Sequence, residues 1–466
     1  MYRVPVQQGE SWLLSRVRRH VSELLRLAAP VIVARAGLLV MAMVDVVFVG
    51  RYGTLDLAQL SLANAPVGAL IASGTGLLIG TLAMTANALG RGQPRECGAI
   101  WRRSVVYAGG VGLVGLAICS VGEPVLLALG QSPRIASGAA DVMFILGLGL
   151  PASLIFTTTA FFLEGLKRPL PGMVAMILAN VLNAFINWLL VFGQWGMPEL
   201  GAAGAAWAST IVRTCLAIGL VLYALNMADH AAYGVRTWPG WRWREWGAQR
   251  RIGYGGGASI GIEAGSFASL SLFAGWLGAV ALGAYSIGLN LLALMFMVAL
   301  GIGSATAVRV GIAHGREDAP DLALAGWTGL GVNTGVMILL GVFLWFFPGA
   351  IAAIFTDEPE LLAASIPLIA ITAFILVADG GQVVVANALR GRGDALGPTV
   401  AHTISYLLVM VPTAWFLALP LGRGVMGLFE GILIASIVSI VLLSLRFHYL
   451  SRRDLRLMAR PAELPG

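Results

Sequence analysis

The sequence predicts an all-α membrane protein of twelve transmembrane helices, arranged as two six-helix lobes. Three observations lead to this fold class: an apolar composition, a series of long apolar runs, and a repeat that relates the two halves of the chain. Of the 466 residues, 58% are hydrophobic and only 11% are charged, with a mean hydropathy of +0.84. A soluble protein of this length carries far more charge on its surface. The 60 glycines suit close packing between membrane helices.

Apolar runs of about 20 residues or more are long enough to cross the hydrocarbon core of a bilayer. Glycine and proline punctuate the short connections between the runs in this chain. The predicted spans are residues 24–50, 57–89, 102–122, 138–163, 170–193, 200–226, 253–277, 280–308, 321–347, 361–389, 398–419 and 424–447.

The spans divide the chain into five parts. A polar, basic arm (1–23) precedes the first lobe (24–226), and the second lobe (253–450) precedes a basic tail (451–466). The linker between the lobes (227–252) contains "VRTWPGWRWREWGAQRR", in which four tryptophans lie beside five arginines. We expect this linker to lie at the lipid headgroups as an amphipathic anchor.

The lysines and arginines predict that both termini are cytoplasmic. With that orientation, nearly all of them fall in cytoplasmic segments, whereas only Arg51, Arg134 and Arg423 fall on the other side. Arg35 and Arg213 lie inside spans. The net charge of +7 is therefore a topology signal. We expect no nucleic-acid partner, because no basic patch is interleaved with base-stacking aromatic residues.

An internal repeat relates the two lobes. "GTLAMTANALGRGQPRE" (80–96) aligns with "GSATAVRVGIAHGRED" (303–318), and "EGLKRPLPG" (164–172) aligns with "RGRGDALGP" (390–398). The offset of about 225 residues gives each half six spans, and an even number keeps both halves in the same orientation. We therefore expect a pseudo-two-fold axis along the membrane normal, a cavity between the lobes, and alternating access.

Other function classes find little support. An enzyme needs a nucleophile with its base, or clustered histidine ligands. The five histidines are scattered, and only His402 lies in a span. No filter-like loop indicates a channel, and Cys97, Cys119 and Cys215 lack metal-ligand spacing. We expect a transporter that has neither catalytic residues nor a cofactor.

Two carboxylates lie at matching depth in the second lobe. Counted at 1.5 Å per residue from the basic residues at the span ends, Glu263 lies about 18 Å and Asp379 about 16 Å into the membrane. Intramembrane acids usually mark ion or proton pathways, and two carboxylates can hold a hard cation such as Na⁺ or share a proton. Gly380 and Gly381 let a neighbouring helix approach closely or let this helix bend.

A second polar set lies in the outer half of the first lobe. Asp45 and Asn187 lie about 28 Å from the cytoplasmic face, and Asn183 lies about 22 Å from it. The i, i+4 spacing of the two asparagines puts them on one helix face. With Asp45 they form a possible site for Na⁺ or a proton. For the asparagines alone, a role in holding helices together remains the equal alternative.

Further candidates line the expected cavity. Arg35 lies about 14 Å deep and nearly three turns from Asp45, so we expect it to pair with an acid from another helix or to face water. Glu164 lies at a span end and is expected at the interface. Met295 and Phe296 offer an adaptable apolar surface for substrates, with ordinary helix packing as the alternative.

The chain resembles the multidrug and toxic-compound extrusion (MATE) family over nearly all of residues 24–450. The resemblance rests on "LAAPVIVARAGLLVMAMVDVVFVGRYG", "GLPASLIFTTTAFFLEGLKRPLPGM", "LNAFINWLLVFGQWGMPELGAAGAAWAST" and "ADGGQVVVANALRGRGD". It implies an antiporter that expels organic, often cationic, compounds against inward Na⁺ or H⁺. It further implies a monomer in the plasma membrane, which for a bacterium is the inner membrane, with drugs as substrates.

The resemblance also assigns residues. The family's coupling residues match Asp45, Asn183, Asn187, Glu263 and Asp379, and a hydroxyl of the sixth span matches Ser209. Pro30 matches the proline of the first helix, where bending is expected. Asn187 in place of an aspartate is more similar to the NorM-type branch than to the DinF-type branch. Arg35 departs from the family pattern, which has an uncharged polar residue there.

The alternative function is a flippase for lipid-linked oligosaccharides, whose general architecture is related. Such a flippase favours a strongly basic central cavity for its pyrophosphate group. The deep charges here are the acids Asp45, Glu263 and Asp379 against Arg35 and Arg213, so the sequence favours efflux.

Overall fold

The computed structural model describes residues 10–237 and 246–459, and these residues form helices, turns and loops without a strand. Trp238, Trp241 and Trp243 of the expected interfacial anchor lie outside the described residues. The helices of the first lobe are α1 (Glu10–Tyr52), α2 (Thr54–Gly90), α3 (Pro94–Cys119), α4 (Gly122–Ala128), α5 (Pro133–Leu148), α6 (Leu150–Gly165), α7 (Leu170–Val191), η1 (Gln194–Gly196) and α8 (Gly201–Leu225), with α9 (His230–Tyr233) after them.

The second lobe begins at α10. Its helices are α10 (Gly247–Trp276), α11 (Ala279–Gly315), α12 (Ala319–Phe346), α13 (Pro348–Phe355), α14 (Pro359–Gly391), α15 (Leu396–His402), the π-helical η3 (Thr403–Met410), α16 (Val411–Ala418) and α17 (Gly424–Ala459). α15, η3 and α16 follow one another directly and together occupy the predicted span 398–419.

The predicted number of spans agrees with the helices. Within the described chain, 10 helices are long and apolar enough to cross a membrane, or 11 if α5 and α6, bent by 40°, form one span. α10 is not among them although it has 30 residues, because Glu263 and its glycine and serine neighbours lower its hydropathy. Together with α10 the helices account for the twelve predicted spans.

The repeat is visible in the order of the helices. A short helix follows the third span in each lobe, and it begins at Gly122 in the first (α4) and at Pro348 in the second (α13). This separation matches the repeat of about 225 residues that the sequence predicts. The predicted fold class, two six-helix lobes, is therefore confirmed.

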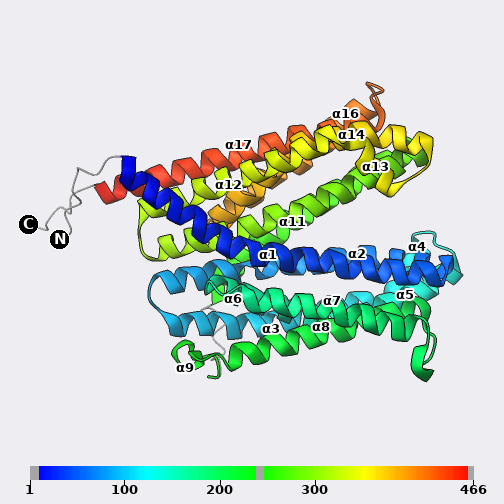
Figure 1. The fold of residues 1–466 in the computed structure, drawn as a ribbon, viewed down its shortest axis with the longest axis horizontal. Coiled ribbons are helices and arrows are strands. Elements are labelled where there is room, and N and C mark those ends of the chain that lie inside the picture. The colour runs from blue at the N-terminus through cyan, green and yellow to red at the C-terminus, as the bar shows by residue number, and fades with distance from the viewer. Residues whose placement is uncertain (1–9, 238–245, 460–466) are drawn as a thin grey trace, which may run out of the picture.

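Both ends of the described chain lie at the same end of the molecule (Figure 1), which we call the terminal end. α11, α12, α14 and α17 lie on one side of α1, and α2, α3, α7 and α8 lie on the other. The helices of the two lobes diverge toward the opposite end, where α4 and α13 lie. The lobes are therefore closest together near the terminal end.

Glycines bring α2 into backbone contact with α10 and α11 near the terminal end. A Cβ atom on Gly76 would lie 2.8 Å from the Gly257 Cα atom, and one on Gly315 would overlap the carbonyl oxygen of Asn87. Backbone atoms cannot rotate out of the way of an added methyl group, as side-chain atoms can. Close approach of this kind between small residues is how membrane helices gain packing energy.

We predict that Gly315→Ala weakens this contact between the lobes. Because the new methyl group would meet the backbone of α2, we expect the free energy of unfolding to fall by roughly 1–3 kcal/mol. Gly335→Ala is the matched control, since a Cβ there meets open space. Thermal unfolding in detergent micelles measures both variants, and equal melting temperatures for the two would contradict the prediction.

Three of the arginines that mark the predicted cytoplasmic side, Arg309, Arg390 and Arg392, are buried. Each lies at or near the end of a long helix, α11 or α14. Burial does not change the side of the membrane on which they lie, so the charge bias that predicts the orientation is unaffected.

Candidate functional site

Asp45 is the centre of a polar cluster between α1, α7 and α8. Its side chain is only 6% exposed. Asn183 Nδ2 and Asn187 Nδ2 donate hydrogen bonds to Oδ1, at 3.1 and 2.7 Å, and Ser209 Oγ donates one to Oδ2 at 2.5 Å. The structure thus brings together the four first-lobe residues that the sequence selects.

The cluster retains oxygen atoms that could hold a cation. The side-chain oxygens of Asn183 and Asn187 are buried and have no hydrogen-bond partner among the described residues. Both face the same region as Asp45, because they lie one turn apart on α7. Arg213, one turn beyond Ser209 on α8, lies within electrostatic range of Asp45. The donor set is a carboxylate, amide and hydroxyl oxygens, which hard cations prefer.

Asp379 is the centre of the second polar cluster, between α14, η3 and α17. Its side chain is 2% exposed. The hydroxyl of Tyr406 donates to Oδ1 at 3.0 Å, Ser436 Oγ at 3.3 Å, and Gln382 Nε2 at 3.5 Å. Glu263, on α10, is partly exposed and lies within electrostatic range of Asp379 and Arg390. The two carboxylates therefore occupy one region of the second lobe.

The sequence did not single out the neutral partners of Asp379. Tyr406, Ser436 and Gln382 all lie in predicted spans, but uncharged polar residues are common there and gave no signal of their own. Gln382 lies one turn from Asp379 on the same helix, and this spacing is the signal that could have indicated it.

Further buried polar atoms have no partner among the described residues. They are Asn333 Nδ2 and Oδ1, both ring nitrogens of His402, and the hydroxyls of Ser405 and Ser439.

A buried polar group without a hydrogen bond is costly. These atoms therefore offer positions at which water or a ligand could bind. The described residues include no group of three or more His, Cys, Asp or Glu side chains that could hold a metal ion. Each cluster offers few carboxylates and several neutral oxygens, and oxygen ligands of this kind suit a hard cation.

Glu164 is buried within the protein, at the end of α6. It is 7% exposed, and its Oε1 lies 3.7 Å from Nη2 of Arg35 on α1. Its expected depth at the membrane interface stays a prediction. Arg35 therefore pairs with an acid from another helix, as the sequence predicts.

The remaining candidates are Met295, Phe296, Pro30 and the two glycines that follow Asp379. Met295 packs against the apolar core of the second lobe, and Phe296 is partly buried on α11. Pro30 is buried within α1. α14 runs unbroken through Gly380 and Gly381. A Cβ on Gly380 would lie 3.0 Å from Met337 of α12, and one on Gly381 would overlap Ile440 of α17, so close packing accounts for both glycines.

A charged network joins the two lobes at the terminal end. His20 of α1 is completely buried, and its Nε2 lies 2.9 Å from Oδ1 of Asp321 on α12. Arg309 of α11 donates to the backbone oxygen of His20 and to its Nδ1. Arg316 Nη2 lies 2.5 Å from Oδ2 of Asp321, and Arg309 Nη2 lies 3.5 Å from Glu23. We call this set the terminal latch.

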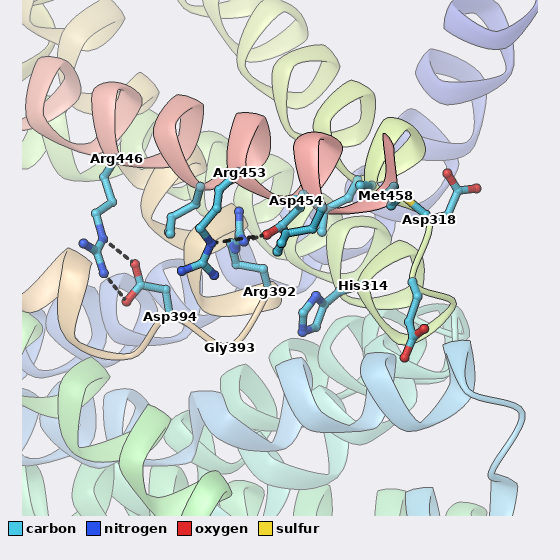
Figure 2. A pocket seen from close by; sticks show the side chains of 14 residues that line it. His314, Asp318, Arg392, Gly393, Asp394, Arg446, Arg453, Asp454 and Met458 are labelled. Atoms are coloured by element: carbon cyan, nitrogen blue, oxygen red, sulfur yellow. Dashed lines mark hydrogen bonds and ion pairs between the residues drawn. The ribbon is translucent and has the colours of Figure 1, made fainter. Parts of the chain in front are cut away.

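A cavity of about 440 Å³ also lies at the terminal end, beside the last turns of α17. Figure 2 shows its charged side chains meeting one another: Arg446 faces Asp394, and Arg392 and Arg453 converge on Asp454. These pairs span 2.8, 2.5 and 3.7 Å. The cavity is remote from both carboxylate clusters, and its paired charges fix the end of α17 to the loop after α14.

A family model described as MatE matches residues 30–189 and 259–416. The probable multidrug resistance protein NorM of Caulobacter vibrioides is 41% identical over 433 residues, which cover 93% of this chain and 92% of that protein. The multidrug resistance protein PmpM of Pseudomonas aeruginosa is 28% identical over 452 residues, which cover 95% and 94%.

Solved structures share the fold. The crystal structure of the eukaryotic MATE transporter AtDTX14 superposes with a TM-score of 0.86 at 20% identity, covering 95% of this chain and 99% of that one. An outward-facing multidrug resistance transporter of the MOP superfamily gives a TM-score of 0.84 at 17% identity, covering 93% and 96%.

Proposed function

Because this chain belongs to the MATE family and its curated relatives are NorM-type, we propose that it is a multidrug efflux transporter that expels organic, chiefly cationic, compounds in exchange for inward Na⁺ or H⁺. One observation carries the coupling part of this proposal. Each lobe buries a carboxylate, Asp45 or Asp379, among neutral hydrogen-bonding groups and far from the surface ion pairs. Such carboxylates are costly in a membrane and usually mark ion pathways.

Exchange follows if the ion and the drug compete for these charges. Ionised Asp45, Glu263 and Asp379 favour a cationic drug in the cavity that the sequence predicts between the lobes. Arrival of Na⁺ or H⁺ neutralises them and weakens that hold, so the drug is released. Coupling of this kind requires only that each ligand binds one state better than the other, and it is reciprocal.

The direction of export rests on orientation. We assign the terminal end to the cytoplasm, as the distribution of lysine and arginine predicts. The glycine contacts of α2 and the terminal latch hold the lobes together at this end, so this conformation is closed toward the cytoplasm. Export then requires the latch to break when the drug enters from the cytoplasm.

Transport in proteoliposomes tests the proposal. The purified chain is reconstituted, and uptake of a fluorescent organic cation is followed under an imposed Na⁺ gradient, an imposed pH gradient, or neither. We expect uptake that depends on one of the gradients and stops when an ionophore dissipates it. Translocation of a lipid-linked oligosaccharide without any gradient-driven cation transport would instead support the flippase.

We predict that Ser209→Ala changes ion binding in the first lobe. The substitution removes the hydroxyl that donates to Asp45 Oδ2, and a hydrogen bond to a charged group contributes about 1.5–3 kcal/mol. If the hydroxyl oxygen also binds Na⁺, the apparent KM for Na⁺ should rise about tenfold or more. The apparent KM for H⁺ should instead fall by a similar factor, because the ionised carboxylate loses a donor that stabilises it. Ser286→Ala is the control, because among the described residues that hydroxyl bonds to Leu282 of its own helix alone. An unchanged ion KM in Ser209→Ala would exclude this serine from the site.

A further inference from the structure

His20 lies at the centre of the terminal latch, where its side chain is completely buried. Arg309 of α11 donates to its ring nitrogen Nδ1 and to its backbone oxygen. The other ring nitrogen, Nε2, lies 2.9 Å from Oδ1 of Asp321 on α12. This one side chain of α1 is therefore joined to two helices of the second lobe.

The contacts of the ring determine where its proton lies. A guanidinium has donors and no acceptor, so Nδ1 must accept the hydrogen bond from Arg309 and carries no hydrogen of its own. The N–H of the neutral ring is then on Nε2, from which it donates to the Asp321 carboxylate. Both ring nitrogens are satisfied in this tautomer, and the latch therefore holds His20 in its uncharged form.

A second proton on the ring would disrupt this arrangement. It would place an N–H on Nδ1, directed at the guanidinium of Arg309, which cannot accept it. It would also add a positive charge to a buried network in which cations already outnumber carboxylates, and like charges repel most strongly away from water. The charged groups of this network are the cations Arg19, Lys167, Arg309 and Arg316 and the carboxylates of Glu23, Asp318 and Asp321.

We propose that His20 makes the terminal latch a pH-sensitive switch. The latched state holds the ring neutral, whereas separation of the lobes at the terminal end exposes the ring to water, where it can take up a proton. Because the proton binds the unlatched state, a fall in pH at this end favours that state, and a rise in pH favours the latched state. Histidine is the side chain that ordinarily changes its charge between pH 5 and 8. This regulation goes beyond the proposed function and does not depend on which ion drives export.

Proton linkage sets the size of the effect. Uptake of one proton by one of two states shifts their ratio by up to about tenfold per pH unit. An ordinary histidine in water titrates near pH 6.5. The ratio of unlatched to latched protein should therefore rise about tenfold between about pH 8 and about pH 5.5.

Distance measurements between the lobes test the switch. Spin labels are attached to the full chain through Arg95→Cys and Arg452→Cys, in a background without the native cysteines. Both arginines are exposed, one in the first turn of α3 and the other near the end of α17, at the terminal end of the two lobes. Pulsed electron–electron resonance in nanodiscs gives the fraction of molecules in which the labels are far apart. We expect this fraction to rise as the pH falls.

Two variants assign the acid response to the latch. His20→Gln keeps a neutral donor for Asp321 but cannot gain a charge, so the response should be lost. Arg309→Gln removes the cation that a protonated ring would meet. Its amide can donate to a neutral ring or accept from a protonated one, so acid should no longer separate the lobes.

Two further variants are controls. His314→Gln changes another histidine near the end of α11 and should respond as the wild type does. Asp379→Asn should also keep the acid response, although the proposed function requires it to lose gradient-driven export. The switch and the coupling mechanism can therefore fail independently of each other.

Three results would overturn the inference: no rise of the separated fraction in the wild type at low pH, a rise of wild-type size in His20→Gln, or loss of the rise in His314→Gln. If His20→Gln fails to fold, the wild type and Arg309→Gln decide, and a full acid response in Arg309→Gln would then contradict the switch.

Discussion

Asp379→Asn should reduce gradient-driven export to the rate seen without a gradient. The substitution removes the charge but preserves the volume, and Tyr406, Ser436 and Gln382 can still donate to the remaining carbonyl oxygen. The fold should therefore persist while the cation loses its principal ligand. We expect a decrease of about a hundredfold or more, which corresponds to about 2.7 kcal/mol. Initial rates of drug uptake into proteoliposomes measure it.

The matched control is Glu360→Gln, the same chemical change in an exposed side chain at the start of α14. It should transport as the wild type does. If Glu263 and Asp379 act as one site, Glu263→Gln should also be defective, and the double variant should be little worse than either single variant. Full gradient-driven export by Asp379→Asn would remove this residue from the coupling mechanism.

Asp321→Asn should open the terminal end of the transporter. The Asp321 carboxylate contacts His20 of α1 and Arg316. His20 in turn is hydrogen-bonded to Arg309. Arg316 is half exposed, so the cost is that of losing a hydrogen bond to a charged group, about 1.5–3 kcal/mol. This cost falls on the conformation in which α1 is joined to α11 and α12. The state with the lobes separated at the terminal end should therefore gain population.

A cysteine reporter between the lobes measures this shift. Ala86 of α2 is fully buried, and a Cβ on Gly311 of α11 would lie 2.9 Å from its methyl group. In a background without the native cysteines, Ala86→Cys should react slowly with a membrane-impermeant thiol reagent applied at the terminal end. Asp321→Asn should speed the reaction by about tenfold or more.

Asp229→Asn is the control for the latch, because its pair with Arg168 lies within the first lobe. It should leave the labelling rate of the reporter unchanged. Faster labelling in both variants would indicate general loosening, and no change in Asp321→Asn would show that the glycine contacts alone keep the terminal end closed.

The sequence predicts the features that follow from periodicity and burial. Twelve apolar runs define the spans, and the repeat relates the lobes. The depth count places Glu263 with Asp379, and the i, i+4 spacing places Asn183 and Asn187 on one face of α7. Asp45 meets both asparagines in the structure, because charges in lipid must find polar partners.

The features that the sequence did not predict depend on contacts between distant segments. Tyr406 and Ser436 surround Asp379 from other helices, and no charge distinguishes them from the polar residues that commonly join membrane helices. Glu164 of α6 meets Arg35 of α1, a contact that a count along each helix does not reveal. The terminal latch joins residues about 300 positions apart, and its histidine lies in the part of the chain that was expected to be a polar arm.

Ion movement driven by the drug tests the central claim most directly. Proteoliposomes with equal Na⁺ concentration and equal pH on both sides are given an outward gradient of an organic cation, and inward movement of ²²Na⁺ or of protons is recorded. Coupled exchange predicts that one of these ions moves inward together with drug efflux, although it has no concentration gradient of its own. Asp379→Asn should abolish this ion movement. Drug efflux at the wild-type rate with neither ion moving would contradict the account.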